Sequence, residues 1–115
     1  MPINSTTEKN ALATKYGQDC TTAAICNADP GTLGSTSISN EVSGGSYARQ
    51  TLSWGAASNG VITASPVFSM PASSTAAWVC LFNAGGTAVD KAQFGASQAF
   101  ATAGTYSPTL TYTQS

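Results

Sequence analysis

The sequence predicts a mainly β protein, either an antiparallel β-sandwich or a partly closed barrel, with one short N-terminal helix. Short apolar or alternating segments recur along most of the chain, and turn signals rich in Gly, Pro, Asn and Asp separate them. With 115 residues the chain suits one compact domain rather than two. We therefore predict an N-terminal arm over residues 1–4 and a single β-rich domain over residues 5–115.

A capping box predicts where the helix begins. The tetrapeptide STTE at residues 5–8 places a Ser at the N-cap and a Glu at the third helical position. The helix is expected to run to Tyr16, which shares a face with Leu12 at a spacing of i, i+4. Gly17 is the expected stop, because helices commonly end at a glycine.

The rest of the chain consists of candidate strands and turns. The segment 36–42 is either a strand or an extended loop, and the segment 89–101 is ambiguous. Turns are expected at Asp29-Pro30-Gly31, at the glycine pairs 44–45 and 85–86, and at Asn59-Gly60. The candidate strands are residues 21–28, 47–54, 61–63, 67–70, 77–82 and 110–113.

The segment AWVCLF, residues 77–82, is the most apolar candidate strand. Alternation places Trp78, Cys80 and Phe82 on one face and the apolar side chains of residues 79 and 81 on the other. Both faces are therefore apolar, which predicts a central strand that is covered on both sides. Six aromatic residues are expected in the core: Trp54, Phe68, Trp78, Phe82, Phe94 and Phe100.

Charge is sparse. Charged residues make up 8% of the chain, against about 25% in an ordinary soluble domain, and the net charge is −1. Four scattered cations supply no footprint for nucleic acid or for a membrane surface, and no apolar run approaches the roughly 20 residues of a spanning helix. The start Met-Pro-Ile-Asn-Ser does not read as a secretory signal, so synthesis in a cytoplasm is expected.

The sequence contains no catalytic constellation. It has no His, which is the commonest general base and metal ligand. The glycine pairs match no phosphate-binding fingerprint, and the acidic residues form no calcium loop. Cys20, Cys26 and Cys80 match no common zinc spacing, and we expect them to be free, packed thiols. The chain is therefore expected to be non-enzymatic, with no cofactor and no metal.

Five residues are candidates for an interface. Tyr47, Tyr106 and Tyr112 each combine an apolar ring with a polar end, which suits a surface contact. If residues 44–46 form a three-residue hairpin loop, Glu41 faces Arg49 on one side of the ribbon. The pair is either an exposed ion pair of small value or a subunit contact, where the planar fork of Arg49 can hold a carboxylate or backbone carbonyls.

Several motifs resemble a family of small tailed-phage proteins. They are NADPG at 27–31, EVSGGSYARQ at 41–50, Trp54-Gly55, the Pro71 loop, the strand ending at Ala84 followed by Gly85-Gly86, and Ala103-Gly104. The family is frequent in phages of actinobacteria and is usually labelled tail-fibre-like. At Cys26 and Asn27 the chain departs from the Leu-His or similar pair expected there. The resemblance, which covers roughly residues 10–113, implies a β-rich virion protein with no enzymatic residues.

These observations predict a structural protein of a tailed-phage virion. A chain without repeats or heptads does not suit a long shaft, so we favour a capsid decoration protein, a homotrimer or other homo-oligomer that binds the coat protein. The alternative is a tail-fibre or tail-tip component that contacts tail proteins and the host surface. A carbohydrate- or ice-binding module is a third hypothesis, which Thr-rich faces and aromatic residues suggest. Against this hypothesis, we expect no regular array of alternating threonines in this chain.

Overall fold

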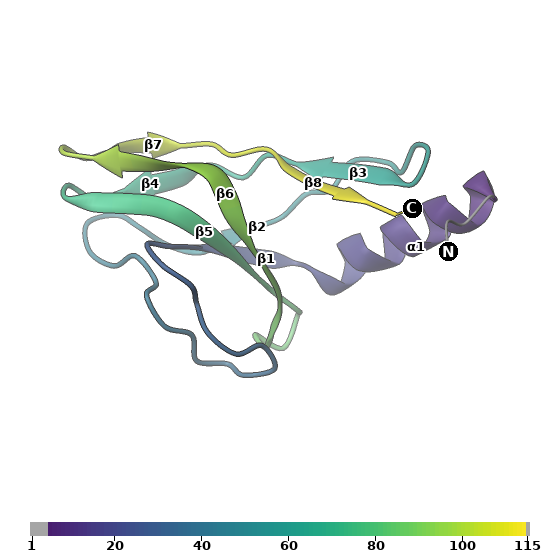
Figure 1. Cartoon of the computed structure of the whole chain (residues 1–115), viewed down its shortest axis with the longest axis horizontal. Coiled ribbons are helices and arrows are strands. Elements are labelled where there is room, and N and C mark those ends of the chain that lie inside the picture. Colours follow the sequence, from purple (N-terminus) through teal and green to yellow (C-terminus); the bar gives the residue numbers. More distant parts are fainter. Residues whose placement is uncertain (1–4, 115) are drawn as a thin grey trace.

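The computed structural model of the chain describes residues 5–114 and has the predicted mainly β architecture. Two layers of antiparallel strands face each other, and one helix lies at one end of the molecule (Figure 1). The strands do not close into a barrel, so the fold is sandwich-like. The predicted arm, residues 1–4, lies outside the described residues.

Helix α1 spans Thr6–Asp19 and begins as predicted. The backbone N–H of Glu8 donates to the Ser5 hydroxyl at 3.3 Å, which satisfies one of the free amides of the first turn. The expected stop at Gly17 is wrong, because the helix continues for two residues. Gly17 instead permits close packing: a Cβ there would lie 3.1 Å from Ile62 and 3.2 Å from the Trp54 ring.

The first layer is a four-stranded antiparallel sheet in the order β2-β1-β5-β6. Its strands are β1 (Thr22–Cys26), β2 (Gln50–Thr51), β5 (Ser74–Phe82) and β6 (Ala88–Phe100). The central position predicted for residues 77–82 is confirmed, because β5 pairs with β1 on one side and with β6 on the other. The ambiguous segment 89–101 proves to be most of β6, the longest strand.

The second layer is a two-stranded ribbon. It consists of β3 (Val61–Ala64) paired with β8 (Leu110–Thr113), and β4 (Phe68–Met70) paired with β7 (Gly104–Tyr106). Both ladders share one register, which places Pro66 opposite Pro108. Neither proline has an N–H to donate, so the hydrogen bonding is interrupted there while the alternation of side chains continues.

Two apolar clusters cover the two faces of the first sheet. The larger cluster lies between the layers and includes Ile25, Phe68 and Val79. The smaller lies on the opposite face, around Cys80 and Phe82, where the segment between β1 and β2 loops across the sheet (Figure 1). The expectation that β5 is covered on both sides is therefore confirmed. Of the six aromatic residues expected in the core, two are fully buried and four pack against the clusters from partly buried positions.

Of the two segments beside β1, 36–42 takes the extended-loop form of its two predicted alternatives, and the strand predicted over 47–54 is largely absent. Segment 36–42 forms an extended loop with one bridge, between Glu41 and Cys26. Segment 47–54 pairs only at Gln50–Thr51. Both segments lie along the same edge of β1, and because that strand has only five residues, neither can form a long ladder there.

Candidate functional site: the β1 edge and the open side of the sandwich

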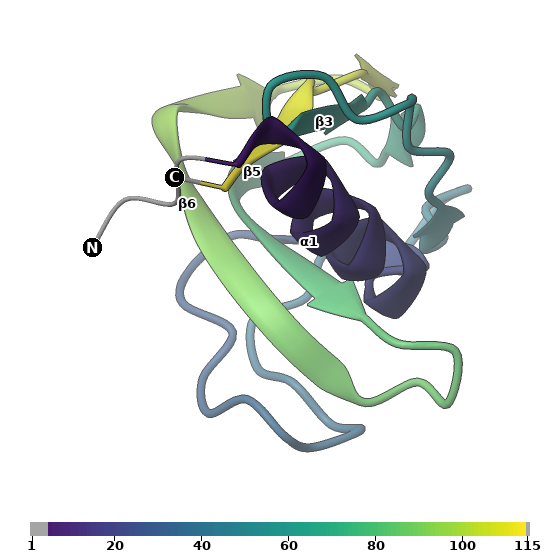
Figure 2. The same cartoon turned by 90° about the vertical axis from the view of Figure 1, so that its right-hand side faces the viewer.

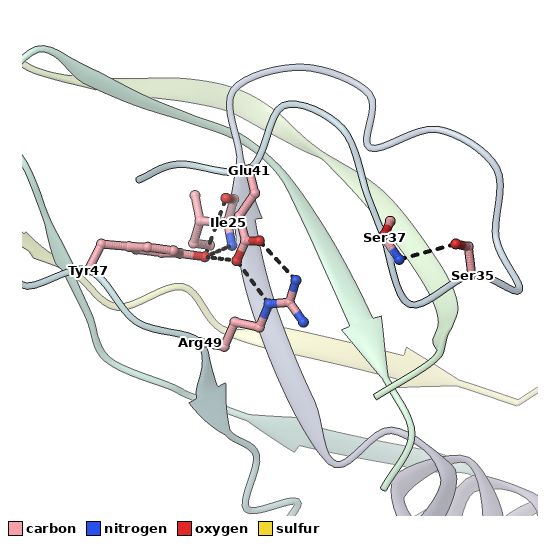
Figure 3. Close-up of polar contacts among 6 residues, drawn as sticks. All are labelled: Ile25, Ser35, Ser37, Glu41, Tyr47 and Arg49. Atoms are coloured by element: carbon pink, nitrogen blue, oxygen red, sulfur yellow. Dashed lines mark hydrogen bonds and ion pairs between the residues drawn. The ribbon is translucent and has the colours of Figure 1, made fainter. Parts of the chain in front are cut away.

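The structure brings three of the five predicted interface residues together. The carboxylate of Glu41 accepts two hydrogen bonds from Arg49, from Nε at 3.0 Å and from Nη2 at 2.9 Å (Figure 3). The Tyr47 hydroxyl donates to the same carboxylate at 3.0 Å. It also accepts from the backbone N–H of Ile25 at 2.9 Å, so the tyrosine links the cluster to β1.

The predicted hairpin between Glu41 and Arg49 is not what joins them. Glu41 is opposite Cys26, and Gln50 is opposite Ala23, on the same edge of β1. Arg49 precedes Gln50 and so lies one position further along that edge. The two charged residues are therefore neighbours along β1, each contributed by a different segment, rather than partners across a turn.

The Arg49 side chain closes the smaller apolar cluster. Its guanidinium carbon lies 4.1 Å from the centroid of the Phe82 ring, in a cation–π arrangement. The hydrogen bonds with Glu41 raise the pKa of Arg49, and burial raises the pKa of Tyr47. Part of the arginine remains accessible, because its side chain is 35% exposed. The cluster is thus a hydrogen-bonded, partly exposed feature at the edge of the sheet.

The other two predicted interface residues lie in the ribbon. Tyr106 packs edge-on against Phe94 and Phe100, with ring centroids 5.5 and 6.0 Å away. Tyr112 stacks on Tyr16 of α1 at 3.9 Å, and its hydroxyl donates to Gln114. Both rings face the interior and are only partly exposed. Their predicted interface role stays a prediction.

The ribbon presents a regular row of hydroxyls to solvent. Alternate residues of its two strands are exposed, and all but one of the exposed positions carry Ser or Thr. We call this surface the hydroxyl face; its exposed residues are Thr63, Ser65, Val67, Ser69, Thr105, Ser107, Thr109, Thr111 and Thr113. The expectation that the chain has no regular array of alternating threonines is therefore wrong. The signal was present in TYSPTLTYT, residues 105–113, where every second residue is Ser or Thr.

A groove of about 420 Å³ opens between the two layers on the side where β6 and β8 face each other. Residues 90–95 of β6 form one wall and residues 109–113 form the other. Val79, Leu81 and Leu110 contribute apolar surface. At one end the Tyr16 hydroxyl donates to the Asp90 carboxylate, and burial raises the pKa of that tyrosine.

No metal centre is apparent in residues 5–114, since none of their His, Cys, Asp and Glu side chains gather in groups of three or more that could hold an ion. The described chain also has no helix long and apolar enough to cross a membrane. All three cysteines are buried and free of disulfides in the structure. Packing shields the three thiols from solvent, because each cysteine lies in one of the two apolar clusters.

Burial of the cysteines predicts a pH-dependent stability. It raises the pKa of Cys20 to about 11 and that of Cys26 to about 12, from 9.0. Above pH 9 the unfolded thiols lose protons that the folded thiols keep, so the free energy of unfolding should fall as the pH rises toward 12, and should be unaffected by these thiols below pH 9. Urea unfolding at pH 8 and pH 10 measures the effect.

The Cys26→Ala variant is the control, because it keeps the buried tyrosines and should show a weaker pH dependence than the parent chain. In the parent chain, all three thiols should react with an alkylating agent after denaturation and resist it before denaturation. Mass spectrometry that finds a disulfide or a bound metal in the unreduced protein would contradict the expectation of free thiols.

The described chain is thus a small, mainly β, sandwich-like domain with three surface features: the Glu41–Arg49 cluster, the hydroxyl face, and the groove, which shares Thr109, Thr111 and Thr113 with the hydroxyl face. Comparison with known proteins finds no matching family model, no matching curated protein and no matching solved structure.

Proposed function

We propose that the chain is a non-enzymatic structural protein of a tailed-phage virion, a decoration protein that binds the coat lattice through its hydroxyl face. The observation that carries this proposal is the continuous, uncharged ribbon surface. Residues 50–89 and 92–115 contain no charged side chain. The nine charged side chains therefore lie in α1, in the segment between β1 and β2, and at residues 90–91.

An uncharged surface of this kind suits a protein contact. The cores of protein–protein interfaces are depleted of charged residues, because burying a charge without a partner is costly. Short Ser, Thr and Val side chains lose little conformational entropy when they become buried. They also leave both backbones of the ribbon accessible to a close neighbour. The family resemblance of the sequence supports a virion as the place of that contact.

The proposal is tested by adding the purified chain to particles that lack it and imaging them by electron microscopy. We expect density at regular positions on the capsid surface. Thr63→Lys places a charge on the hydroxyl face and should abolish binding, whereas Thr14→Lys, at an exposed position of α1, should bind like the parent chain. Density on the tail instead of the capsid would show that the partner is a tail protein rather than the coat protein. Binding to neither capsid nor tail would refute the proposal.

Oligomerisation is a further expectation, with a homotrimer favoured. A net charge of −1 gives little repulsion between copies. Light scattering on the purified chain, alone and with capsids, should reveal an oligomer in solution or on the particle. A chain that stays monomeric and binds neither capsid nor tail would contradict the structural role.

Arg49 is expected to contribute to particle binding. Glu41 accepts one hydrogen bond from Arg49 Nε and one from Nη2. The remaining N–H groups of the guanidinium can donate to a carboxylate or carbonyl of a neighbour. Arg49→Lys keeps the charge and loses the fork, so binding should weaken in both Arg49→Lys and Arg49→Ala while the fold is retained. Unchanged binding by both variants, measured by co-sedimentation with particles, would show that Arg49 takes no part in particle binding.

A further inference from the structure

The open side of the sandwich exposes two strand edges that have no partner strand. β6 is the last strand of its sheet, and β8 pairs with β3 on one side only. Within residues 5–114, a neighbouring loop meets the outer backbone of β6 only at Ala88, whose N–H donates to Ser35 and whose carbonyl accepts from Gly34. From there on, β6 runs along the border of the sheet (Figure 2).

The walls of the groove are these strand edges rather than strand faces. Successive side chains of a strand point to opposite faces, so a cavity that touches one face meets every second residue. This groove is lined by six consecutive residues of β6, by all four residues of β8 and by Thr109 directly before β8. Backbone N–H and C=O groups therefore border it, and such groups are the template for an added strand.

Gly95 leaves room for another backbone. It lines the groove, where β6 bulges between the pairs Trp78–Gln93 and Ala76–Gln98. Its φ is not positive, and a Cβ placed on it would meet nothing within 4 Å. Neither conformation nor packing within the chain requires a glycine here. Glycine inside a strand weakens it, and often marks the close approach of a second backbone.

The groove presents no unpaired charge. Asp90 accepts from the Tyr16 hydroxyl and from the backbone N–H of Lys91. The Lys91 ammonium points to the other face of the sheet, where it contacts Asp29 at 2.8 Å and the Gly31 carbonyl at 2.7 Å. An occupant of complementary chemistry is therefore uncharged, with apolar side chains toward the larger cluster.

We infer that an extended, uncharged segment of a coat subunit adds to the β6 edge as a further strand and fills this groove. The mode is β-strand addition, in which backbone hydrogen bonds provide affinity. A segment matching residues 90–95 needs about six residues. The coat as source rests on the proposed function.

Hydrogen–deuterium exchange on the full chain, free and bound to particles that lack it, tests the inference. We expect the amides of residues 90–95 and 109–113 to become protected on binding. Ala92→Lys places a charge in the groove and should weaken binding by at least about tenfold, or about 1.4 kcal/mol. Ala96→Lys is the matched control, because it is exposed on the same strand but does not line the groove, and it should bind like the parent chain.

The outcomes separate the two proposals. Binding without protection of residues 90–95, or unchanged binding by a folded Ala92→Lys, would refute strand addition and leave the virion role standing. No binding to particles would refute the virion role. Protection of the same amides in the free chain with rising concentration would identify a second copy as the occupant and overturn the inference. The exchange measurement on the parent chain decides the question even if Ala92→Lys fails to fold.

Discussion

Replacing Phe82 by Ala should lower the free energy of unfolding by about 3–5 kcal/mol. The ring is 1% exposed and lies at the centre of the smaller cluster, beside Cys80 and Ala24. Its removal leaves a cavity, and it also takes away the surface over which the Arg49 guanidinium lies. The effect of both losses is measured by urea unfolding at a fixed pH near 7.

Val67→Ala is the control for this experiment. Val67 is apolar but 54% exposed on the hydroxyl face, so its truncation should change the free energy of unfolding by no more than about 0.5 kcal/mol, the usual range for surface positions. If Phe82→Ala lowered the free energy of unfolding as little as Val67→Ala, the smaller cluster would not be a stabilising core.

Gly60→Ala should be the second most damaging single change. Gly60 has a φ of 78°, a backbone conformation that costs a residue with a Cβ about 1–2 kcal/mol. A Cβ there would also lie 2.7 Å from the Gln114 carbonyl oxygen and 3.0 Å from the Lys9 side chain. The turn would have to separate from α1 or from the end of β8, so a further loss of about 1–3 kcal/mol is expected.

Gly86→Ala separates the two contributions to that loss. Gly86 has a φ of 82°, close to that of Gly60, but a Cβ on it would meet nothing within 4 Å. It should therefore lose only the conformational part, about 1–2 kcal/mol. Equal losses of thermal stability in the two variants would show that the turn at Gly60 can move away from its neighbours at no cost.

Local patterns were sufficient to predict the frame of the molecule. The capping box gave the start of α1, and the apolar run at residues 77–82 predicted a central strand covered on both sides. These features depend on side chains close together in the sequence, so they can be recognised without knowing the fold. The end of α1 was mispredicted because Gly17 serves a contact with Trp54 and Ile62, which only the tertiary structure brings together.

The candidate sites were harder to predict, because they depend on pairing between distant segments. The ion pair of Glu41 with Arg49 was anticipated, but its cause was wrong, since β1 rather than a hairpin aligns the two residues. The groove could not be predicted at all, because it depends on which strand edges remain open. The hydroxyl face was predictable from the alternation in residues 105–113, once that alternation is followed across Pro108, which lies between β7 and β8.

The pairing of β1 with β5 also has a consequence for how the chain is made. Thr22 pairs with Phe82, and Cys26 pairs with Trp78, so β1 leaves the ribosome long before its main partner. The ribbon likewise pairs β3 with the last strand, β8. Contacts between such distant segments slow folding, and they expose the apolar segment at residues 77–82 in the meantime. The two layers can therefore be completed only after β8 has been synthesised, and we expect folding to depend on chaperones whenever the chain is produced in quantity.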